Sequence, residues 1–246
     1  MIIKIDGKAC SCEPGEYLLS VARRNRILIP TFCNHDGLPG QGCCRVCVVE
    51  VVTRGRDAVV SSCVYPVEEE CEVYTNNDRV KRQRRMVLAL LRARAPEAER
   101  VARLCKMYGA PQYDRFVESP GEKCIMCGLC VKACQSLGTG AIATVNRGVD
   151  KAISTPYNKP SADCVGCGSC ASVCPAGAIE LKEDESARTI WGKEFKLQIC
   201  ECCGKPAGTR EELDLAARKA GLGSVTLCTE CRRKAIANAM ASAYGK

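Results

Sequence analysis

The sequence predicts an α+β protein assembled from several small modules, each built around cysteines. The chain of 246 residues contains 22 cysteines spread along its length and has 4% aromatic residues. The cysteines recur at short intervals that suit metal ligands, so each small core would be supported by its own metal site. Short strand patterns and short helix patterns alternate between these intervals.

A disulfide framework is the competing interpretation of so many cysteines. The N-terminal residues MIIKIDGK contain no apolar secretory segment, and the cysteine spacings are those of metal ligands. No stretch has the uninterrupted apolar length that crosses a membrane. We therefore expect a cytoplasmic protein with reduced thiols and no membrane association.

The formal net charge of +8 is typical of nucleic-acid-binding proteins until the metals are counted. Four sites with four thiolates each, around cores of charge +2, would together contribute about −8. The basic excess then compensates metal sites, and we expect no nucleic-acid partner.

Residues 1–76 have the pattern of a β-grasp ferredoxin domain. Residues 2–5 and 9–12 flank Asp6-Gly7, which is a strong hairpin signal. Pro14-Gly15 then precedes a predicted helix. Its apolar face contains Tyr17, Leu18, Val21 and Ala22. A cysteine loop and a strand over residues 46–52 follow, and this order of elements is what a β-grasp ferredoxin requires.

The loop of this domain offers the four ligands of a [2Fe–2S] cluster, Cys33-x10-Cys44-x2-Cys47-x15-Cys63. Plant-type [2Fe–2S] ferredoxins have four residues between the first two ligands, so this loop is longer. Small and flexible residues around Gly42 would let backbone amides approach the cluster sulfurs. Cys43, beside Cys44, is an alternative ligand on spacing alone.

Residues 77–112 are predicted to form a helical linker, with a basic, helical pattern over residues 77–108. The basic residues include Arg79, Lys81, Arg82, Arg84 and Arg85. The apolar side is formed by Met86, Val87, Leu90 and Leu91. We interpret the pattern as a solvated helix that bridges two cluster domains, and the alternative is a docking face for a partner subunit.

Residues 113–186 contain two cysteine runs with the spacing of a two-cluster, bacterial-type ferredoxin. The runs are Cys124-x2-Cys127-x2-Cys130-x3-Cys134 and Cys164-x2-Cys167-x2-Cys170-x3-Cys174-Pro175. In this arrangement three thiolates of each run hold one [4Fe–4S] cluster and the fourth ligates the other cluster. The first cluster would take Cys124, Cys127, Cys130 and Cys174, and the second Cys134, Cys164, Cys167 and Cys170. Zinc knuckles are the alternative, but zinc sites use paired cysteines and need no third at the same interval.

Between the runs, residues 141–145 and 151–154 flank Asn146-Arg147-Gly148 and predict a hairpin. Residues 138–143 formally match a dinucleotide-binding fingerprint. We interpret this match as chance, because the cluster ligands leave no room for the βαβ unit that the fingerprint needs.

Residues 187–246 predict a zinc-ribbon-like C-terminal module. Two pairs, Cys200-x2-Cys203 and Cys228-x2-Cys231, are separated by a helix over residues 211–220 that a capping box at 209–212 introduces. A second helix begins near Thr229. Paired spacing favours Zn²⁺ at these four cysteines, with a further [4Fe–4S] cluster as the alternative. Cys202 is expected to be a bystander.

The three cluster motifs occur in the order found in a known group of proteins, and the resemblance covers about residues 1–183. The dipeptide Ile29-Pro30 and the G-x-C-R-x-C run from Gly42 to Cys47 resemble the N-terminal domain of the complex I iron–sulfur subunit. Diaphorase-linked hydrogenase subunits and iron-only hydrogenases share this domain. The shared register makes Cys44 the ligand and Cys43 a spare thiol.

The complex I subunit usually carries an additional cluster bound by one histidine and three cysteines. The corresponding stretch here holds Cys105 alone, and the single histidine, His35, lies in the first cluster loop. We expect neither the additional cluster nor a ligand role for His35.

The resemblance implies a small iron–sulfur subunit of a cytoplasmic NAD(P)-linked oxidoreductase, with the diaphorase side of a multimeric, electron-bifurcating [NiFe] hydrogenase favoured. Equivalent subunits of formate dehydrogenases, aldehyde oxidoreductases and benzoyl-CoA reductases are the alternatives. Clusters carry single electrons whereas NADH delivers a hydride, so a flavin must stand between them. The chain has no convincing flavin or nicotinamide motif and no catalytic constellation. Expected partners are a flavin/NAD(P)-binding subunit, a catalytic subunit and ferredoxin.

A redox-sensing regulator is the alternative from another class. It would use Arg232, Arg233 and Lys234, beside Cys231, to bind nucleic acid. A sensor needs one labile cluster, whereas three cluster motifs in series are typical of an electron relay. An iron-only hydrogenase would need further cysteines for its catalytic centre, and the six left unassigned are scattered.

Overall fold

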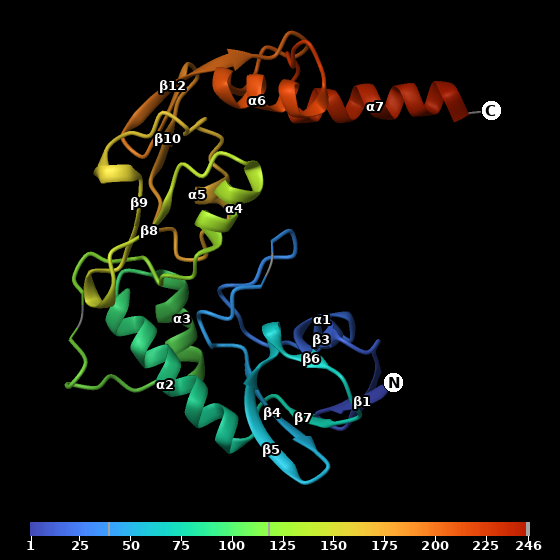
Figure 1. Ribbon diagram of the computed structural model, residues 1–246, viewed down its shortest axis with the longest axis vertical. Helices are drawn as coiled ribbons and strands as arrows, with labels where there is room; N and C mark the ends of the chain where they lie inside the picture. Colours follow the sequence, from blue (N-terminus) through green and yellow to red (C-terminus); the bar gives the residue numbers. More distant parts are fainter. Residues whose placement is uncertain (39, 118, 245–246) are drawn as a thin grey trace. The chain divides into compact units, whose positions relative to one another are not determined.

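The computed structural model describes residues 1–38, 40–117 and 119–244, so the last two residues of the predicted 187–246 module lie outside it. The chain forms two compact units (Figure 1). Unit 1 comprises Met1–Lys132 and Val173–Ala178, and unit 2 comprises Ala133–Ser172 and Ile179–Lys246. The predicted α+β class is confirmed, whereas the four module boundaries stay predictions.

Unit 1 begins with a β-grasp domain whose five-stranded sheet has the order β2-β1-β7-β4-β5. Its strands are β1 (Ile2–Ile5), β2 (Lys8–Ser11), β4 (Val48–Thr53), β5 (Arg56–Ser61) and β7 (Glu72–Tyr74). The hairpin predicted at Asp6-Gly7 joins β1 and β2. The central pairing of β1 with β7 is parallel and the other pairings are antiparallel. β3 (Glu16–Tyr17) pairs with β6 (Pro66–Val67) beside this sheet.

Helix α1 (Leu18–Arg24) covers one face of the sheet with Leu18, Leu19, Val21 and Ala22, all buried. They pack with Ile3, Ile5, Val49, Val51 and Val73. Each fully buried aliphatic side chain contributes about 1.5–3 kcal/mol. The prediction that Tyr17 lies on this buried face is wrong. Tyr17 belongs to β3 and is half exposed, because the backbone pairs there with Pro66 before the helix starts.

The basic segment forms two helices, α2 (Asp78–Arg94) and α3 (Glu99–Tyr108), which pack against each other (Figure 1). Pro96 separates them, because proline disfavours a helical residue before it and cannot donate the helical hydrogen bond. Asn77 caps α2 by accepting a hydrogen bond from the Val80 amide. Leu88 of α2, with Val87 and Leu91 beside it, packs with the loop that contains Phe32, Cys33 and Cys44. The prediction that Leu90 belongs to this apolar side is wrong, because its side chain is half exposed.

Helix α4 (Leu129–Leu137) carries the chain from unit 1 into unit 2. The predicted hairpin is confirmed as β8 (Ala143–Val145) and β9 (Ala152–Ser154). The short helix α5 (Ser169–Ser172) lies within the second cysteine run and contains Cys170. A four-stranded antiparallel sheet, not expected from the sequence, has the order β10-β11-β12-β13. Its strands are β10 (Leu181–Glu183), β11 (Ala187–Ile190), β12 (Lys193–Ile199) and β13 (Pro206–Thr209).

Helix α6 (Arg210–Ala220) packs against β12 and β13 and is followed by α7 (Thr229–Tyr244). The capping box is confirmed, since the Thr209 hydroxyl accepts a hydrogen bond from the Glu212 amide at 3.1 Å. Such a cap stabilises a helix by about 1 kcal/mol. Beyond Cys231, the α7 residues within the described range are mostly exposed.

Candidate metal centres

The four cysteines predicted to hold a [2Fe–2S] cluster converge in unit 1, and all four are buried. Cys33 and Cys44 lie in the loop between α1 and β4, Cys47 directly precedes β4, and Cys63 lies in the short helix η1 (Ser62–Val64). The Cys44 amide donates to Cys33 Sγ at 3.4 Å. Hydrogen bonds with the Cys44 and Cys63 thiols lower the pKa of Cys33, and a hydrogen bond with Cys63 lowers the pKa of Cys47 to about 6. Neighbouring Cys43 is exposed.

Helix α2 holds this loop through Arg84. Its Nε donates to the Val46 carbonyl at 3.1 Å, and Nη2 donates to the carbonyls of Val48 at 2.6 Å and Thr75 at 3.1 Å. The expectation that Arg84 belongs to a solvated basic face is wrong, because its side chain is 1% exposed. Arg79, Lys81, Arg82 and Arg85 are exposed or partly so, as that expectation required.

Three cysteines of the first run and one of the second belong to unit 1. Cys124, Cys127 and Cys130 are joined there by Cys174, because residues 173–178 belong to this unit and not to unit 2. Backbone amides approach two of these sulfurs: Met126 N donates to Cys124 Sγ at 3.4 Å and Ala178 N to Cys174 Sγ at 3.3 Å. Burial raises the pKa of Cys127 to about 11, and the charge of Cys174 adds to the shift.

Unit 2 contains the complementary set. Cys134, Cys164, Cys167 and Cys170 line one partly open cavity. Ala141, Ile142, Ile190 and Trp191 contribute to its apolar wall. Side chains contact three of the sulfurs. Thr139 Oγ1 lies 3.1 Å from Cys134 Sγ, Ser169 Oγ lies 3.3 Å from Cys167 Sγ, and Trp191 Nε1 donates to Cys170 Sγ at 3.4 Å.

The β10–β13 sheet supports the loop that carries Cys164 and Cys167. Lys193 Nζ donates to the Cys164 carbonyl at 3.0 Å, Thr209 Oγ1 to the Val165 carbonyl at 2.5 Å, and Arg188 Nη1 to the Gly166 carbonyl at 2.8 Å. Gly166 has φ +68°, and a Cβ there would lie 2.7 Å from the Phe195 ring. The loop conformation therefore depends on glycine and on the C-terminal sheet.

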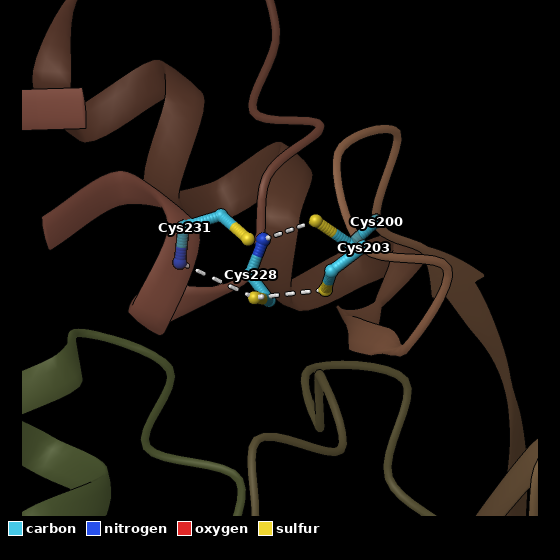
Figure 2. Close-up of side chains that lie close together, drawn as sticks. All are labelled: Cys200, Cys203, Cys228 and Cys231. Carbon is cyan, nitrogen blue, oxygen red and sulfur yellow. Dashed lines mark hydrogen bonds between the residues drawn. The ribbon is translucent and has the colours of Figure 1, made fainter. Parts of the chain in front are cut away.

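The four C-terminal cysteines form a tight cluster, shown in Figure 2, with all four sulfurs within 4.8 Å of one another. Cys200 and Cys203 come from the turn between β12 and β13, and Cys228 and Cys231 from the start of α7. Cys203 Sγ and Cys228 Sγ are 3.7 Å apart, and the Cys228 amide donates to Cys200 Sγ at 3.3 Å. Cys200 and Cys231 are buried, Cys228 is partly buried and Cys203 is exposed.

The remaining cysteines belong to none of these sets, although four of them share apolar clusters with the candidate ligands. Cys10, Cys12, Cys71 and Cys105 are buried in the apolar packing of unit 1. Cys202 is exposed, and its thiol interacts with Cys231. His35 Nδ1 accepts a hydrogen bond from the Gly37 amide at 3.2 Å.

The residues fit the groups that the spacings predict. The sulfurs of the second cubane set line one shared cavity, and the C-terminal sulfurs lie close enough together to match one ion. A metal with sulfurs at about 2.3 Å in a tetrahedron places them about 3.8 Å apart. Beside the first cubane set, Gln41 Nε2 is buried and has no hydrogen-bond partner among the described residues, so it is a donor available to a cluster sulfur.

Sequence reasoning missed Arg84 and Trp191. Arg84 is one of several arginines in a basic helix, and its burial follows from packing against residues distant in sequence. Trp191 is the single tryptophan and follows a short strand, and this alone gave no signal of contact with a cysteine 21 residues earlier.

Two domain families match the chain. Residues 1–78 match the 2Fe-2S iron-sulfur cluster binding domain, and residues 123–178 match the 4Fe-4S dicluster domain. No described helix has the length and apolar character needed to cross a membrane.

Several curated proteins are similar in sequence. NADP-reducing hydrogenase subunit HndD of Solidesulfovibrio fructosivorans is 35% identical over 210 residues, which is 73% of this chain and 36% of the relative. The NADH-ubiquinone oxidoreductase 75 kDa subunit of Reclinomonas americana is 30% identical over 76% of this chain and 30% of its own length. The alpha subunit of an NADPH-Fe(3+) oxidoreductase of Geobacter sulfurreducens is 28% identical over 82% of this chain and 26% of its own length. The chain thus spans about a third of the length of these relatives.

One solved structure has the same fold over most of its length. It is a chain of an NAD⁺-reducing [NiFe]-hydrogenase in the H₂-reduced state, with a TM-score of 0.62 and 23% identity. The match covers 85% of this chain and 94% of that one. The chain is therefore an iron–sulfur protein with 2Fe-2S and dicluster 4Fe-4S domains, related to NAD(P)-reducing hydrogenase subunits and to the 75 kDa subunits of NADH-ubiquinone oxidoreductase.

Proposed function

We propose that this chain is an electron-transfer subunit that relays single electrons between a flavin/NAD(P)-binding subunit and a partner catalytic subunit, with a hydrogenase favoured as that partner. Iron–sulfur clusters supply one-electron redox chemistry when bound. The chain's own residues hold them, exclude water from them and donate hydrogen bonds to their sulfurs. A cytoplasmic location remains part of this proposal.

The packing between the first two candidate cluster loops is the observation that carries the proposal. Cys33, Cys44 and Cys127 belong to one apolar cluster of unit 1. The Gln41 side chain lies beside Gly128, where a Cβ would be 3.4 Å from Gln41 Oε1. Two candidate cluster loops that share one apolar cluster suit transfer of electrons between them better than chemistry on a substrate.

We assign the [2Fe–2S] cluster to Cys33, Cys44, Cys47 and Cys63, the first cubane to Cys124, Cys127, Cys130 and Cys174, and the second to Cys134, Cys164, Cys167 and Cys170. The division of the cysteines between the two units supports the crossed assignment of Cys134 and Cys174. This division places Cys134 with three cysteines of the second run and Cys174 with three cysteines of the first run, as in two-cluster ferredoxins.

We further propose that Cys200, Cys203, Cys228 and Cys231 hold a redox-inert Zn²⁺ ion. A cubane places its four cysteine sulfurs on four different irons and thus further apart than the 3.7 Å between Cys203 and Cys228. A closed four-thiolate zinc site has no open position for chemistry, so its role is structural. It ties α7 to the turn between β12 and β13.

The iron inventory tests the proposal. We expect about ten irons per chain, from one two-iron and two four-iron clusters, together with about one zinc. EPR of the reduced anaerobic protein should show one two-iron signal and interacting four-iron signals. The pure, flavin-free chain should accept electrons from dithionite without oxidising NAD(P)H. Full iron loading without a two-iron signal, or NADH-dependent dye reduction by this preparation, would contradict the proposal.

Replacement of the two adjacent cysteines tests the [2Fe–2S] ligands. Cys44→Ser should remove the two-iron signal because this thiol is buried beside Cys33, whereas Cys43→Ser should retain it because Cys43 is exposed. Equal loss in both variants would show that the ligand set is wrong. The four-iron signals serve as the internal control for folding.

A further inference from the structure

Arg84 is a fully buried cation without a carboxylate partner. None of the ion pairs found among the described residues includes it, and its side chain is 1% exposed. Asp6, the carboxylate whose charge acts on it, accepts hydrogen bonds from the Thr75 amide and hydroxyl instead. A buried charge is strongly unfavourable unless another charge compensates it.

The neighbours of Arg84 identify where the compensating charge lies. Its guanidinium binds the carbonyls of Val46 and Val48, the residues on either side of Cys47. Burial lowers the pKa of Arg84, and electrostatic interactions with Tyr108, Cys47 and Asp6 act in the opposite direction. The ring of Tyr108 lies 5.2 Å from the guanidinium carbon, and this cation–π contact is weaker than pairing with a full negative charge.

A [2Fe–2S] cluster with four thiolates would carry a charge of about −2 when oxidised and about −3 after it takes one electron. The electron comes from an external reductant and no proton needs to move, because arginine stays protonated. A fixed cation beside this site therefore interacts more favourably with the reduced state than with the oxidised state.

We propose that Arg84 is the internal counterion of the [2Fe–2S] site and a positioning residue for Cys47. The cation raises the midpoint potential of this cluster, and its hydrogen bonds fix the two peptides that flank the ligand. The inference rests on the proposed assignment of the [2Fe–2S] cluster to Cys33, Cys44, Cys47 and Cys63.

An EPR-monitored redox titration of the holoprotein tests this inference with Arg84→Met. At a fixed potential the ratio of reduced to oxidised two-iron cluster should fall at least tenfold, which corresponds to about 59 mV for one electron. Arg82→Met is the matched control, since it removes the same charge from an exposed position of the same helix. This control should change the ratio less than twofold, because solvent screens exposed charges. The four-iron potentials should not move in either variant.

Two further variants separate charge from packing. Arg84→Lys keeps the charge but loses the forked donor, whereas Arg84→Gln keeps a donor and loses the charge. The counterion role is supported if Arg84→Lys keeps a midpoint potential near that of the wild type while Arg84→Gln shows the lowered potential expected of Arg84→Met. This comparison decides the question even if Arg84→Met does not bind the two-iron cluster. Equal shifts for Lys and Gln, or an unshifted Arg84→Met protein, would overturn it. Absence of the two-iron signal from the wild type would instead contradict the proposed cluster assignment.

Discussion

The two cubane loops have the same cysteine spacing but different surroundings. In unit 1, the Met126 amide donates to Cys124 Sγ, and the loop from Cys124 to Cys130 packs Ile125 and Leu129 into an apolar cluster. In unit 2, the loop from Cys164 to Cys170 receives an indole N–H at Cys170 Sγ, and its own Ser169 hydroxyl lies beside Cys167 Sγ. The cations Lys193 and Arg188 bind its backbone carbonyls. Where the first loop has Leu129, the second has Ser169.

The shared backbone conformation explains why the spacing is the same. Met126 has φ 56° and Gly166 has φ 68° at corresponding positions, and Gly128 and Gly168 correspond with φ 76° and 72°. This turn aims the three sulfurs of each run at one centre. Hydrogen bonds to sulfur and local charge set cluster potentials. The spacing therefore determines which cluster binds, and the residues around the loop determine its potential, which should be higher for the second cubane.

Gly166→Ala should have the largest effect of the changes that probe this comparison. The new Cβ would lie 2.7 Å from the buried Phe195 ring at a positive φ, so the loop must move and the second cubane should be lost. Iron analysis should show about four irons fewer per chain, with one four-iron EPR signal remaining.

Met126→Gly is the matched control for that prediction. It places glycine at the corresponding position of the first loop, where glycine adopts a positive φ without strain. The first cubane should be retained. Retention of both cubanes in Gly166→Ala would show that Phe195 does not constrain the second loop.

Opening the C-terminal metal site should have an intermediate effect. Cys228→Ser removes one of the four clustered thiols and should release zinc. The sheet that supports the second cubane loop continues into this site through β12 and β13, so that loop should become less stable. We expect both cubane spectra at first, followed by several-fold faster loss of the second cubane in the presence of an iron chelator.

The first cubane is the internal standard for that measurement, because its ligands belong to unit 1. Equal acceleration for both cubanes would indicate general unfolding. An unchanged rate of loss of the second cubane would show that its stability does not depend on the C-terminal site.

Trp191→Phe should have the smallest effect. It preserves the aromatic wall of the cavity and removes the N–H that donates to Cys170 Sγ. A hydrogen bond contributes about 0.5–1.5 kcal/mol, so the ratio of reduced to oxidised second cubane should fall roughly twofold to tenfold at a fixed potential. Redox titration measures this, and an equal shift of the first cubane would refute a local role for Trp191.

The sequence predicted the elements whose signals are local. Each of three confirmed features depends on a few adjacent residues. They are the Asp6-Gly7 hairpin, the helix capping box that begins at Thr209 and the hairpin around Asn146. The convergence of Cys200, Cys203, Cys228 and Cys231 was also predictable, because two C-x2-C pairs have the spacing of metal ligands.

The features that sequence did not reveal depend on tertiary contacts. Strands β10 to β13 are short and rich in charged residues, so their alternation is weak, and they are defined by pairing with one another. Burial of Arg84 depends on carbonyls 36 and 38 residues away in the chain. No local pattern separates this arginine from the exposed ones of the same helix.

An EPR-monitored redox titration of the wild-type holoprotein tests the central claim most directly. The account predicts one two-iron signal and two four-iron signals, with the second cubane reduced at the higher potential. Comparison with Gly166→Ala identifies that signal, because the variant should lack it. Absence of a two-iron signal from fully loaded protein, or a higher potential for the cubane that Gly166→Ala retains, would contradict the account.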